Sequence, residues 1–586
     1  MIRNERGYAL ILVMFMVVIF LILGTAVMAA TIGGATRTEK REDDVQSLHL
    51  AEKTLDEAVA YLVSQYDGEA MRPEDLAYDM LQSEVDKLKD KITNTRLNGA
   101  EGKIIKAEPR ELAPDHTSYS VTLTAEATVN NTKRTLQQEV IISSYPEFLN
   151  YAFGSEKDVI INGSVFSPKG SIYAGKELRI DNWADYNYLT IDKWTEAAYP
   201  RLDLKDDNKV FVQSLNAIKV HTGMIGDREE DDYTSYLSSS KTIDELLGIP
   251  EDKIQIRSNE KFVSIDVEET FIDKATEATG NNLARTEIKN AIKSGDSTTF
   301  SDKLASYGVT KMTAQPVKPT PPLDLDNMSE MDDYYDNLDD YNDYIRQFSN
   351  ISDSMLYDGN LELDGIEYKA LEFDNDAQQG INSSDVKWFI VNGNLNIKNY
   401  NPDPEDLKIK GNILVSGDVT ISGNVLVDAT IYTLGKTTLQ DAIIRGMEDV
   451  DDHDRKQLMM ISKGKIFINR VDAPNNHGSY SSGGPNTLDA FFYTDDSAEL
   501  FGVGSVFWLH GGFFSKGTLT INAVRGDVTD HGVDFNFQGA QEGLDKDKSR
   551  FVIEYYDKFF DNQSSALPRV EKLSVQVKSR KLISNP

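Results

Sequence analysis

The sequence predicts an α+β protein that begins with a long helix, transmembrane at first and then amphipathic, followed by a small antiparallel sheet. A parallel β-helix (solenoid) with a mixed α/β insertion is expected after it. Three observations predict this arrangement. No charged residue occurs between Arg6 and Arg37. Apolar and polar residues alternate over 103–144, and a Gly-x-apolar-x-apolar unit recurs at six-residue spacing between 393 and 439.

The composition narrows the classes of function. The chain of 586 residues carries a formal net charge of −34. Nucleic acid is therefore not expected as a partner, because its phosphates would be repelled. The chain contains no cysteine, which excludes disulfides, thiolate metal sites and cysteine nucleophiles. The acidic balance suits a solvated, extracellular surface, and the 26 Tyr and 24 Phe are ample for folded cores.

The apolar run from Tyr8 to Ile32 is long enough to cross a membrane. As a helix it would measure about 38 Å at roughly 1.5 Å per residue, against a hydrocarbon core of about 30 Å. The run exceeds the apolar core of a secretory signal, although Val27-Met28-Ala29 leaves open a cleavage site and a discarded signal. Arg3 and Arg6 precede the run, which predicts a single-pass protein in contact with membrane lipid, with a cytoplasmic N-terminus and an extracellular body.

The helical pattern continues beyond the apolar run. Between Thr38 and Tyr66 the apolar residues follow one another in steps of three and four, which is typical of an amphipathic helix. We therefore expect one helix over 8–66, half in lipid and half packed on a folded domain. The apolar positions of its second half are Val45, Leu48, Ala51, Leu55, Ala58, Val59, Leu62 and Tyr66.

Residues 3–66 resemble the N-terminus of type IV pilins and pseudopilins. The stretch "NERGYALILVMFMVV" is similar to their class III leader, with the charged Arg6 before Gly7, and "SLHLAEKTLDEAVAYL" resembles the PilX-like minor pilins of Gram-positive bacteria. The resemblance implies a prepilin leader at 1–7, a prepilin peptidase that cuts between Gly7 and Tyr8, and methylation of Tyr8. It also implies other pilin-like subunits as partners.

One residue departs from this family. The fifth residue of a mature major pilin is Glu, which can neutralise the terminal ammonium of a neighbouring subunit within the membrane, and here that position is Leu12. A carboxylate in lipid is costly unless it is paired. A subunit with Leu can therefore span the membrane but cannot form the pair. In the family, minor subunits without this Glu are associated with the filament tip, so Leu12 favours an initiating or tip subunit.

Residues 67–147 are expected to form an α+β headgroup like that of a pilin. "SYSVTLTAEATV" and "TLQQEVII" read as two strands with apolar residues on one face. Asn130 and Asn131 between them fit a hairpin turn.

Two Gly-rich regions, 148–185 and 385–470, predict the β-helix. The first contains three short strands separated by glycines, and the second repeats a six-residue unit that is the mark of a parallel β-helix. "GNILVSGDVTISGNVLV" resembles the rungs of bactofilin-like polymer-forming proteins. The repeated units begin at Gly393, Gly411, Gly417, Gly423, Ala429 and Gly435.

The region between them, 186–384, is expected to be an insertion in the solenoid or a separate middle domain. It contains a Pro-rich linker at 315–322 and an acidic amphipathic helix at 329–348, with a heptad-like apolar stripe. Residues 471–586 read as further β-strands that extend the solenoid and cap its C-terminal end.

No catalytic constellation emerges, and no cofactor is expected. The histidines do not lie at the spacing of a helical metal pair, and neither a phosphate-binding loop nor a nucleophile elbow is present. The acidic stretch 448–454 is a weak candidate for Ca²⁺, which prefers oxygen ligands, although it lacks the central Gly of a Ca²⁺ loop. The candidate ligands are Asp449, Asp451, Asp452 and Asp454.

The sequence therefore favours a minor pilin-like surface protein, anchored by its N-terminal helix and suited to a pilus tip, that displays a β-solenoid for adhesion or spacing to a surface ligand. Two alternatives stay open. One is a membrane-tethered, polysaccharide-active β-helix enzyme. Such an enzyme would use a similar β-helix with a groove of carboxylates and basic residues, and the fold alone does not decide the function. The other is a structural cell-envelope protein, or a plain single-pass protein, outside any pilus.

Overall fold

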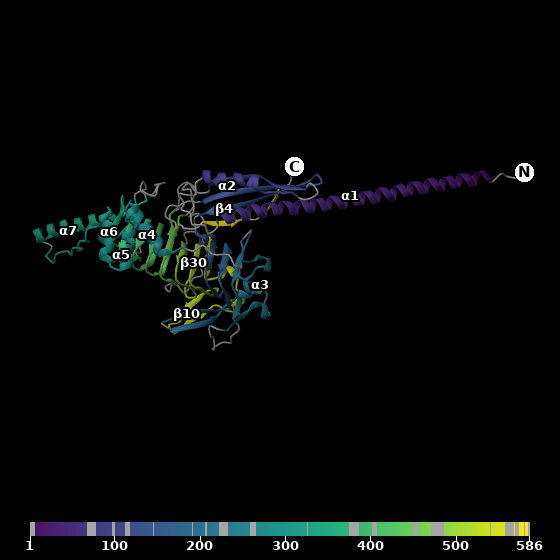
Figure 1. Ribbon diagram of the computed structural model, residues 1–586. Coiled ribbons are helices and arrows are strands. Elements are labelled where there is room, and N and C mark those ends of the chain that lie inside the picture. The colour runs from purple at the N-terminus through teal and green to yellow at the C-terminus, as the bar shows by residue number, and fades with distance from the viewer. Residues whose placement is uncertain are drawn as a thin grey trace. The chain divides into compact units, whose positions relative to one another are not determined.

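The structure is a computed structural model of the chain, and it divides into two compact units (Figure 1). The N-terminal unit comprises residues up to 112, 116–144 and 571–586, and the second unit, here called the body, comprises 113–115 and 145–570. The residues described are 6–66, 78–95, 100–111, 118–143, 146–189, 191–205, 208–221, 232–257, 265–324, 326–373, 386–400, 407–448, 455–469, 486–539, 541–556, 568, 573–578 and 580–583.

The N-terminal unit consists of a long helix, a short helix and an antiparallel sheet. The helix α1 runs without a break from Arg6 to Tyr66, as the sequence predicts. The strands are ordered β1-β2-β3-β4, and β35 and β36 both pair with β4. The other elements are α2 (Tyr78–Lys91), β1 (Thr93–Thr95), β2 (Glu101–Glu111), β3 (Ser118–Val129), β4 (Thr132–Ser143), β35 (Ser574–Val577) and β36 (Lys581–Ile583).

The predicted hairpin of this sheet is confirmed. Strands β3 and β4 pair antiparallel from Ser118 opposite Ser143 to Val129 opposite Thr132. Asn130 and Asn131 form the turn with φ of 44° and 70°. Both values lie in the left-handed region, which a two-residue hairpin loop requires and which asparagine tolerates.

The C-terminal strands correct the expected domain boundaries. The sequence places 471–586 on the solenoid, but β35 pairs with β4 from Ser574 opposite Ser143 to Val577 opposite Val140. Leu573 is fully buried in the core of the N-terminal unit. The chain therefore leaves this unit after β4, builds the body, and returns to the same sheet. Alternating apolar residues predict a strand here but not the sheet that it joins.

The body is mostly β and is dominated by one continuous set of strands, here called the strand stack, in which nearly every neighbouring pair is parallel. Its first column contains, in spatial order, β17 (Thr310–Lys311), β18 (Met355–Asp358), β21 (Phe389–Asn392), β23 (Leu407–Val415), β24 (Val419–Thr433), β26 (Leu458–Ser462), β28 (Thr487–Thr494), β30 (Phe507–Ser515), β5 (Tyr151–Ser155), β8 (Ser171–Ala174), β13 (Val210–Val212) and β16 (Ile254–Ile256).

Two further columns run beside the first. The second contains β19 (Leu361–Asp364), β22 (Leu395–Asn399), the start of β24, β25 (Thr437–Gly446), β27 (Ile466–Asn469), β29 (Ala498–Gly502), β31 (Leu519–Ala523), β6 (Val159–Gly163), β9 (Leu178–Asp181) and β14 (Ile218–His221), with β15 (Tyr233–Ser235) antiparallel to β14. The third contains β20 (Ala370–Glu372), parts of β23, β24, β25, β28 and β30, then β34 (Phe551–Tyr555), β7 (Phe166–Lys169) and β12 (Arg201–Leu202).

The six-residue period of the sequence corresponds to strand register. Leu407 pairs with Val425 and Ile413 with Ile431, so neighbouring strands are separated by three periods along the chain. Between β21 and β23 the separation is one period longer, because Phe389 pairs with Ile413. In each strand the alternate residues point inward, and they form one continuous apolar core.

The spatial order of the stack differs from the order of the sequence. Strand β30 pairs with β5, Phe513 lying opposite Phe153, and β31 pairs with β6 in the same way. The early strands β5–β16 therefore continue the end of the late series β18–β31 rather than its beginning. This order corrects the expected position of 186–384, because β12, β13, β14 and β16 belong to the stack itself.

The chain crosses from one end of the stack to the other through helices α4 (Val267–Ala278), α5 (Arg285–Ser294) and α6 (Ser297–Ser306) (Figure 1). Their apolar residues pack on the outward side of the first column, which we call the covered face. Its strand residues include Ile390, Leu414, Tyr432, Met459, Ile461, Phe491, Tyr493 and Phe514. The outward side of the second column is called the polar face.

The remaining elements lie outside the three columns. The predicted acidic helix 329–348 is present as α7 (Met328–Arg346), preceded by the Pro-rich linker. A hairpin of β10 (Trp183–Tyr188) and β11 (Ile191–Glu196) lies against β31 and β6. Two smaller features are α3 (Ile243–Leu247) and the antiparallel pair β32 (Val528–Asp530) and β33 (Phe535–Phe537).

Candidate functional site

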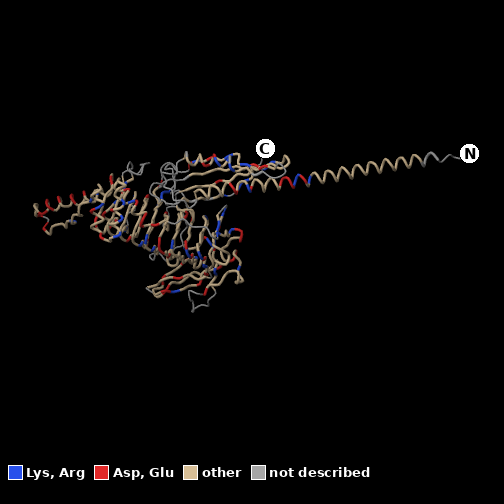
Figure 2. The backbone as a smooth tube through the Cα atoms, in the orientation of Figure 1, with Lys and Arg blue, Asp and Glu red and all other residues tan. Residues whose placement is uncertain are grey.

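The N-terminal part of α1 is a wholly exposed apolar rod. From Leu10 to Leu23 each large apolar side chain is between 47% and 69% exposed. Figure 2 shows no charged residue along this part of the helix. Among the described residues, α1 is the one helix long and apolar enough to cross a membrane.

The predicted processing residues lie at the start of this rod. Gly7 and Tyr8 belong to the first turn of α1, which begins at Arg6. Leu12 lies on the exposed apolar surface of the same helix. The structure therefore places all three in one helical segment.

The second half of α1 packs on the antiparallel sheet. Leu55, Ala58 and Leu62 are fully buried in the core of the N-terminal unit. At Gly102 of β2, an added Cβ would lie 2.5 Å from Thr54 Oγ1, so glycine permits the close approach of strand and helix. One helix thus presents two surfaces of different character, apolar and exposed before residue 33 and buried on one side after residue 43.

Polar contacts fix the point where α1 meets the sheet. Asn130 Nδ2 donates a hydrogen bond of 3.0 Å to Asp43 Oδ1 from the β3–β4 turn. Arg134 donates from β4 to Asp44 Oδ1 at 2.5 Å. Two of the acidic residues that follow the apolar run therefore bind the unit's own sheet.

The described histidines do not build a metal site. His510 Nδ1 lies 3.1 Å from the fully buried Asp489, His49 pairs with Glu52 at 2.9 Å, and His221 lies 3.8 Å from Asp181. No group of three or more His, Asp or Glu side chains among the described residues is arranged to hold a metal ion. The Ca²⁺ candidates Asp449, Asp451, Asp452 and Asp454 lie outside the described residues.

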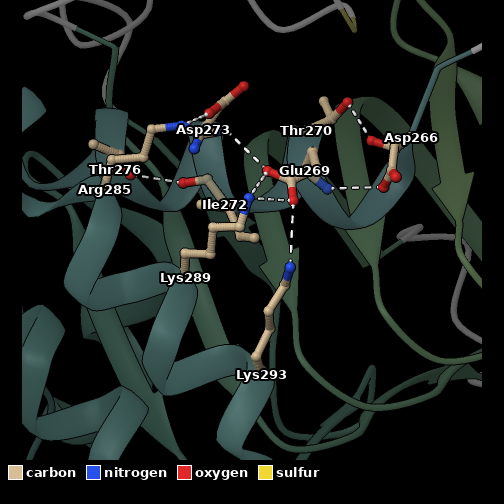
Figure 3. Close-up of polar contacts among 9 residues, drawn as sticks. All are labelled: Asp266, Glu269, Thr270, Ile272, Asp273, Thr276, Arg285, Lys289 and Lys293. Carbon is tan, nitrogen blue, oxygen red and sulfur yellow. Dashed lines mark hydrogen bonds and ion pairs between the residues drawn. The ribbon is translucent and has the colours of Figure 1, made fainter.

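An ionic cluster joins α4 to α5 (Figure 3). The Glu269 carboxylate accepts hydrogen bonds from Lys289 at 2.8 Å and Arg285 at 3.0 Å, and Lys293 Nζ lies 3.7 Å away. Arg285 also donates to Asp273 at 2.6 Å. The hydrogen bond from Lys289 lowers the pKa of Glu269, whereas burial raises the pKa of Asp273. Each carboxylate here already faces a cation, so the cluster fixes the helices to each other.

A second polar group, on the polar face, was missed from the sequence. It consists of Phe467 of β27, Glu499 and Phe501 of β29, and Asp185 and Trp194 of the β10–β11 hairpin. The sequence signal was the presence of Phe467 and Phe501 at outward positions of strands whose inward positions are Ile and Leu. That signal is readable only once the register of the strands is known.

The chain matches no family model and no curated protein. It is similar to a solved structure, the crystal structure of competence-associated pilin ComZ from Thermus thermophilus. The two chains are 12% identical, the likeness covers 92% of this chain and 98% of the other, and the TM-score is 0.24.

Proposed function

We propose that this protein is a minor pilin-like surface protein, held in the membrane by α1 and processed between Gly7 and Tyr8. The proposal rests on the different surroundings of the two halves of α1. Its first half exposes an uncharged apolar surface long enough to span lipid, and its second half is part of a folded domain. A single continuous helix that serves both purposes is what a retained anchor requires, whereas a discarded signal needs no continuation.

The flanking charges support one orientation. Arg3 and Arg6 precede the apolar segment, which favours a cytoplasmic N-terminus and an extracellular body. With Leu12 at the fifth mature position, the subunit brings no carboxylate into the membrane to pair with a neighbour's terminal ammonium. This supports an initiating or tip position, beside other pilin-like subunits, over a repeating one.

We infer that the three columns of parallel strands form a β-helix that is displayed on the surface for adhesion or spacing. Its continuous apolar core and its covering helices support a rigid body. We favour a role in binding over turnover. The His510 ring stacks on Trp508, packs at a tilt against Tyr556 and places Nδ1 3.1 Å from Asp489.

N-terminal mass spectrometry of the protein purified from its host tests the proposal. The expected product begins at Tyr8 and carries one methyl group on its amino nitrogen. A Gly7→Val variant is the matched control, and it should retain the leader because the peptidase cuts after glycine in the family that residues 3–66 resemble.

Two results would contradict it. Native protein that begins at Met1 in cells with an active prepilin peptidase would favour a plain anchor or a cell-envelope protein outside any pilus. Native protein that begins at Ala30 and is freely soluble would identify the apolar run as a discarded signal.

A further inference from the structure

The polar face carries two adjacent outward rows of side chains. The register of β25, β27, β29 and β31 aligns the first row, and the register of β27, β29, β31 and β6 aligns the second. Neighbouring members of a row lie on adjacent strands, which are about 4.8 Å apart. The first row is Thr438, Phe467, Glu499 and Thr520, and the second is Asn469, Phe501, Asn522 and Asn162.

Two phenylalanines form an accessible apolar platform within these polar rows. The ring centroids of Phe467 and Phe501 are 5.7 Å apart, and Phe467 is 37% exposed. Their neighbours along the rows are hydroxyl, amide and carboxylate side chains. The two rings are inclined by 51° to each other. An apolar patch rimmed by hydrogen-bonding groups fits the face of a sugar ring, which is apolar on its C–H side and polar at its edge.

The β10–β11 hairpin supplies a second wall. One side of the hairpin is buried against β32 and β33, and it carries Ala184, Tyr186 and Tyr188. Asp185 lies on the opposite side of the hairpin, directly across from Trp194, which is 42% exposed. The Asp185 backbone N–H donates to Asn522 Oδ1 at 3.1 Å, so the edge of β10 at Asp185 meets the second row next to Phe501.

The carboxylates of the hairpin act on Glu499 of β29. Burial raises the pKa of Asp185 to about 6, with a further contribution from the charge of Asp192. Burial also raises the pKa of Glu499, and the charges of Asp185 and Asp192 add to the effect. Lys465 opposes it without forming an ion pair with Glu499 within the described residues. The charges of Asp185 and Asp192 therefore reach Glu499, and the opposing charge that acts on Glu499 is that of Lys465.

Polar groups at the meeting of the walls are left without partners. Asn522 is fully buried, and its Nδ2 has no hydrogen-bond partner in the part of the chain that the structure describes. Asp185 Oδ1 is also buried and has no hydrogen-bond partner among the described residues. Unpaired buried polar atoms are costly, so a ligand that completed their hydrogen bonds would gain affinity from doing so.

We propose that this surface, defined by Trp194 and Asp185 of the hairpin and Phe467, Glu499 and Phe501 of the strand stack, binds a polysaccharide whose sugars carry free amino groups. Charge complementarity selects this ligand. The aromatic rings receive the sugar faces, and the carboxylates accept charge-assisted hydrogen bonds from ammonium groups. A single metal ion is a poor alternative, because no three acidic side chains among the described residues are arranged to ligate one.

Isothermal titration of the purified full chain in detergent tests the proposal with two probes, a glucosamine hexamer and its fully N-acetylated counterpart. The glucosamine hexamer should bind, and the acetylated hexamer should bind about tenfold more weakly, because it lacks the ammonium groups. Glu499→Gln should weaken binding of the glucosamine hexamer about tenfold and leave the acetylated one unchanged. Phe501→Ala should weaken both.

Two matched variants serve as controls. Glu362→Gln changes an acidic residue in the outward position of β19, in the same column but distant from the hairpin, and Tyr335→Ala changes an exposed aromatic residue on α7. Neither should alter binding. Equal affinity for the two hexamers, or binding that is indifferent to Glu499→Gln, would overturn recognition of amino groups. Failure of both hexamers to bind would overturn the site, and the proposed membrane and pilin-like role would be unaffected, since it depends on α1.

Discussion

The covered face and the polar face of the strand stack are built on the same strand ladder and differ in their outward side chains. On the covered face the outward residues are aromatic or aliphatic, and Phe491, Tyr493 and Phe514 pack around Phe148 with centroid distances of 4.1–5.9 Å. On the polar face the corresponding positions carry Thr, Asn and Glu, with Phe467 and Phe501 among them. The first face is closed by α4–α6, and the second is left accessible beside the hairpin.

The two faces therefore have different purposes on the same strands: the covered face contributes to stability, and the polar face is available for binding. The inward residues of both columns belong to the same core, so they determine that strands form but not what covers them. The outward residues determine the covering, because an apolar row must be buried and a polar row need not be. The exposed aromatic residues of the polar face are therefore the exceptions that call for a ligand.

The largest expected effect contrasts one phenylalanine from each face. Phe491→Ala on the covered face should lower the free energy of unfolding of the body by about 3–5 kcal/mol, because a fully buried ring leaves a cavity. Phe467→Ala on the polar face should cost less than about 1 kcal/mol, since that ring is already partly in water. Urea unfolding followed by tryptophan fluorescence reports on the body alone, because all four tryptophans belong to it. Similar losses for the two variants would show that the faces are not energetically distinct.

Much of this contrast could be predicted from the sequence, and the features that could not be predicted were missed for physical reasons. The six-residue period predicted inward and outward positions, because alternation is local to each strand. The long helix α1 was predictable from its apolar run and from the steps of three and four between the apolar residues that follow it, and α7 from its heptad-like stripe. These patterns depend on neighbours a few residues apart.

Spatial order was not predictable in the same way. The strands have similar alternating apolar side chains and the same backbone hydrogen-bonding groups at their edges. Nothing local therefore requires Phe513 to pair with Phe153 or Ser574 to pair with Ser143. The binding surface was missed for the same reason, because Asp185 and Glu499 come from segments far apart in the chain. The processing residues Gly7 and Tyr8 were assigned from the resemblance of a contiguous stretch, which needs no tertiary information.

The second effect concerns the helices that close the covered face. Glu269→Gln should lower the free energy of unfolding by about 1–2 kcal/mol, because Lys289, Arg285 and Lys293 lose their shared carboxylate. Urea unfolding at low and high salt checks this, and the loss should shrink as salt screens the charges. An exposed acidic residue of α7, Asp336, gives the matched control as Asp336→Asn. A salt-independent loss would indicate that packing, not charge, holds α4 to α5.

A third effect should depend on pH and belongs to the polar face. The pKa of Asp185 is about 6 in the folded protein and is taken as 3.8 in the unfolded chain. The folded protein therefore binds the carboxyl proton more tightly than the unfolded chain does. The carboxyl therefore costs no stability below pH 3.8, costs progressively more as the pH rises toward 6, and costs a constant amount above that. Asp185→Asn should be more stable than the parent by roughly 1 kcal/mol at neutral pH, a value reduced for partial solvent screening.

Melting of the two proteins across this pH range measures the difference directly. Asp192→Asn should give a smaller gain with the same sign, because it removes the charge that acts on Asp185 and Glu499, while its amide oxygen can still accept the hydrogen bond from Asn187 Nδ2. A parent protein that gains stability relative to Asp185→Asn as the pH rises would mean that the carboxylate is paired rather than isolated.

The smallest effect is expected on the solvent side of the covering helices. Lys303 of α6 and Glu287 of α5 pair at 2.8 Å, but their side chains are 42% and 48% exposed. Water and salt screen such a pair, and ordering two long side chains offsets most of the attraction. Lys303→Gln should therefore leave the urea midpoint unchanged within error, in contrast to Glu269→Gln on the same pair of helices. If Lys303→Gln were as damaging as Phe491→Ala, the covered face would be closed by its surface charges and not by its aromatic packing.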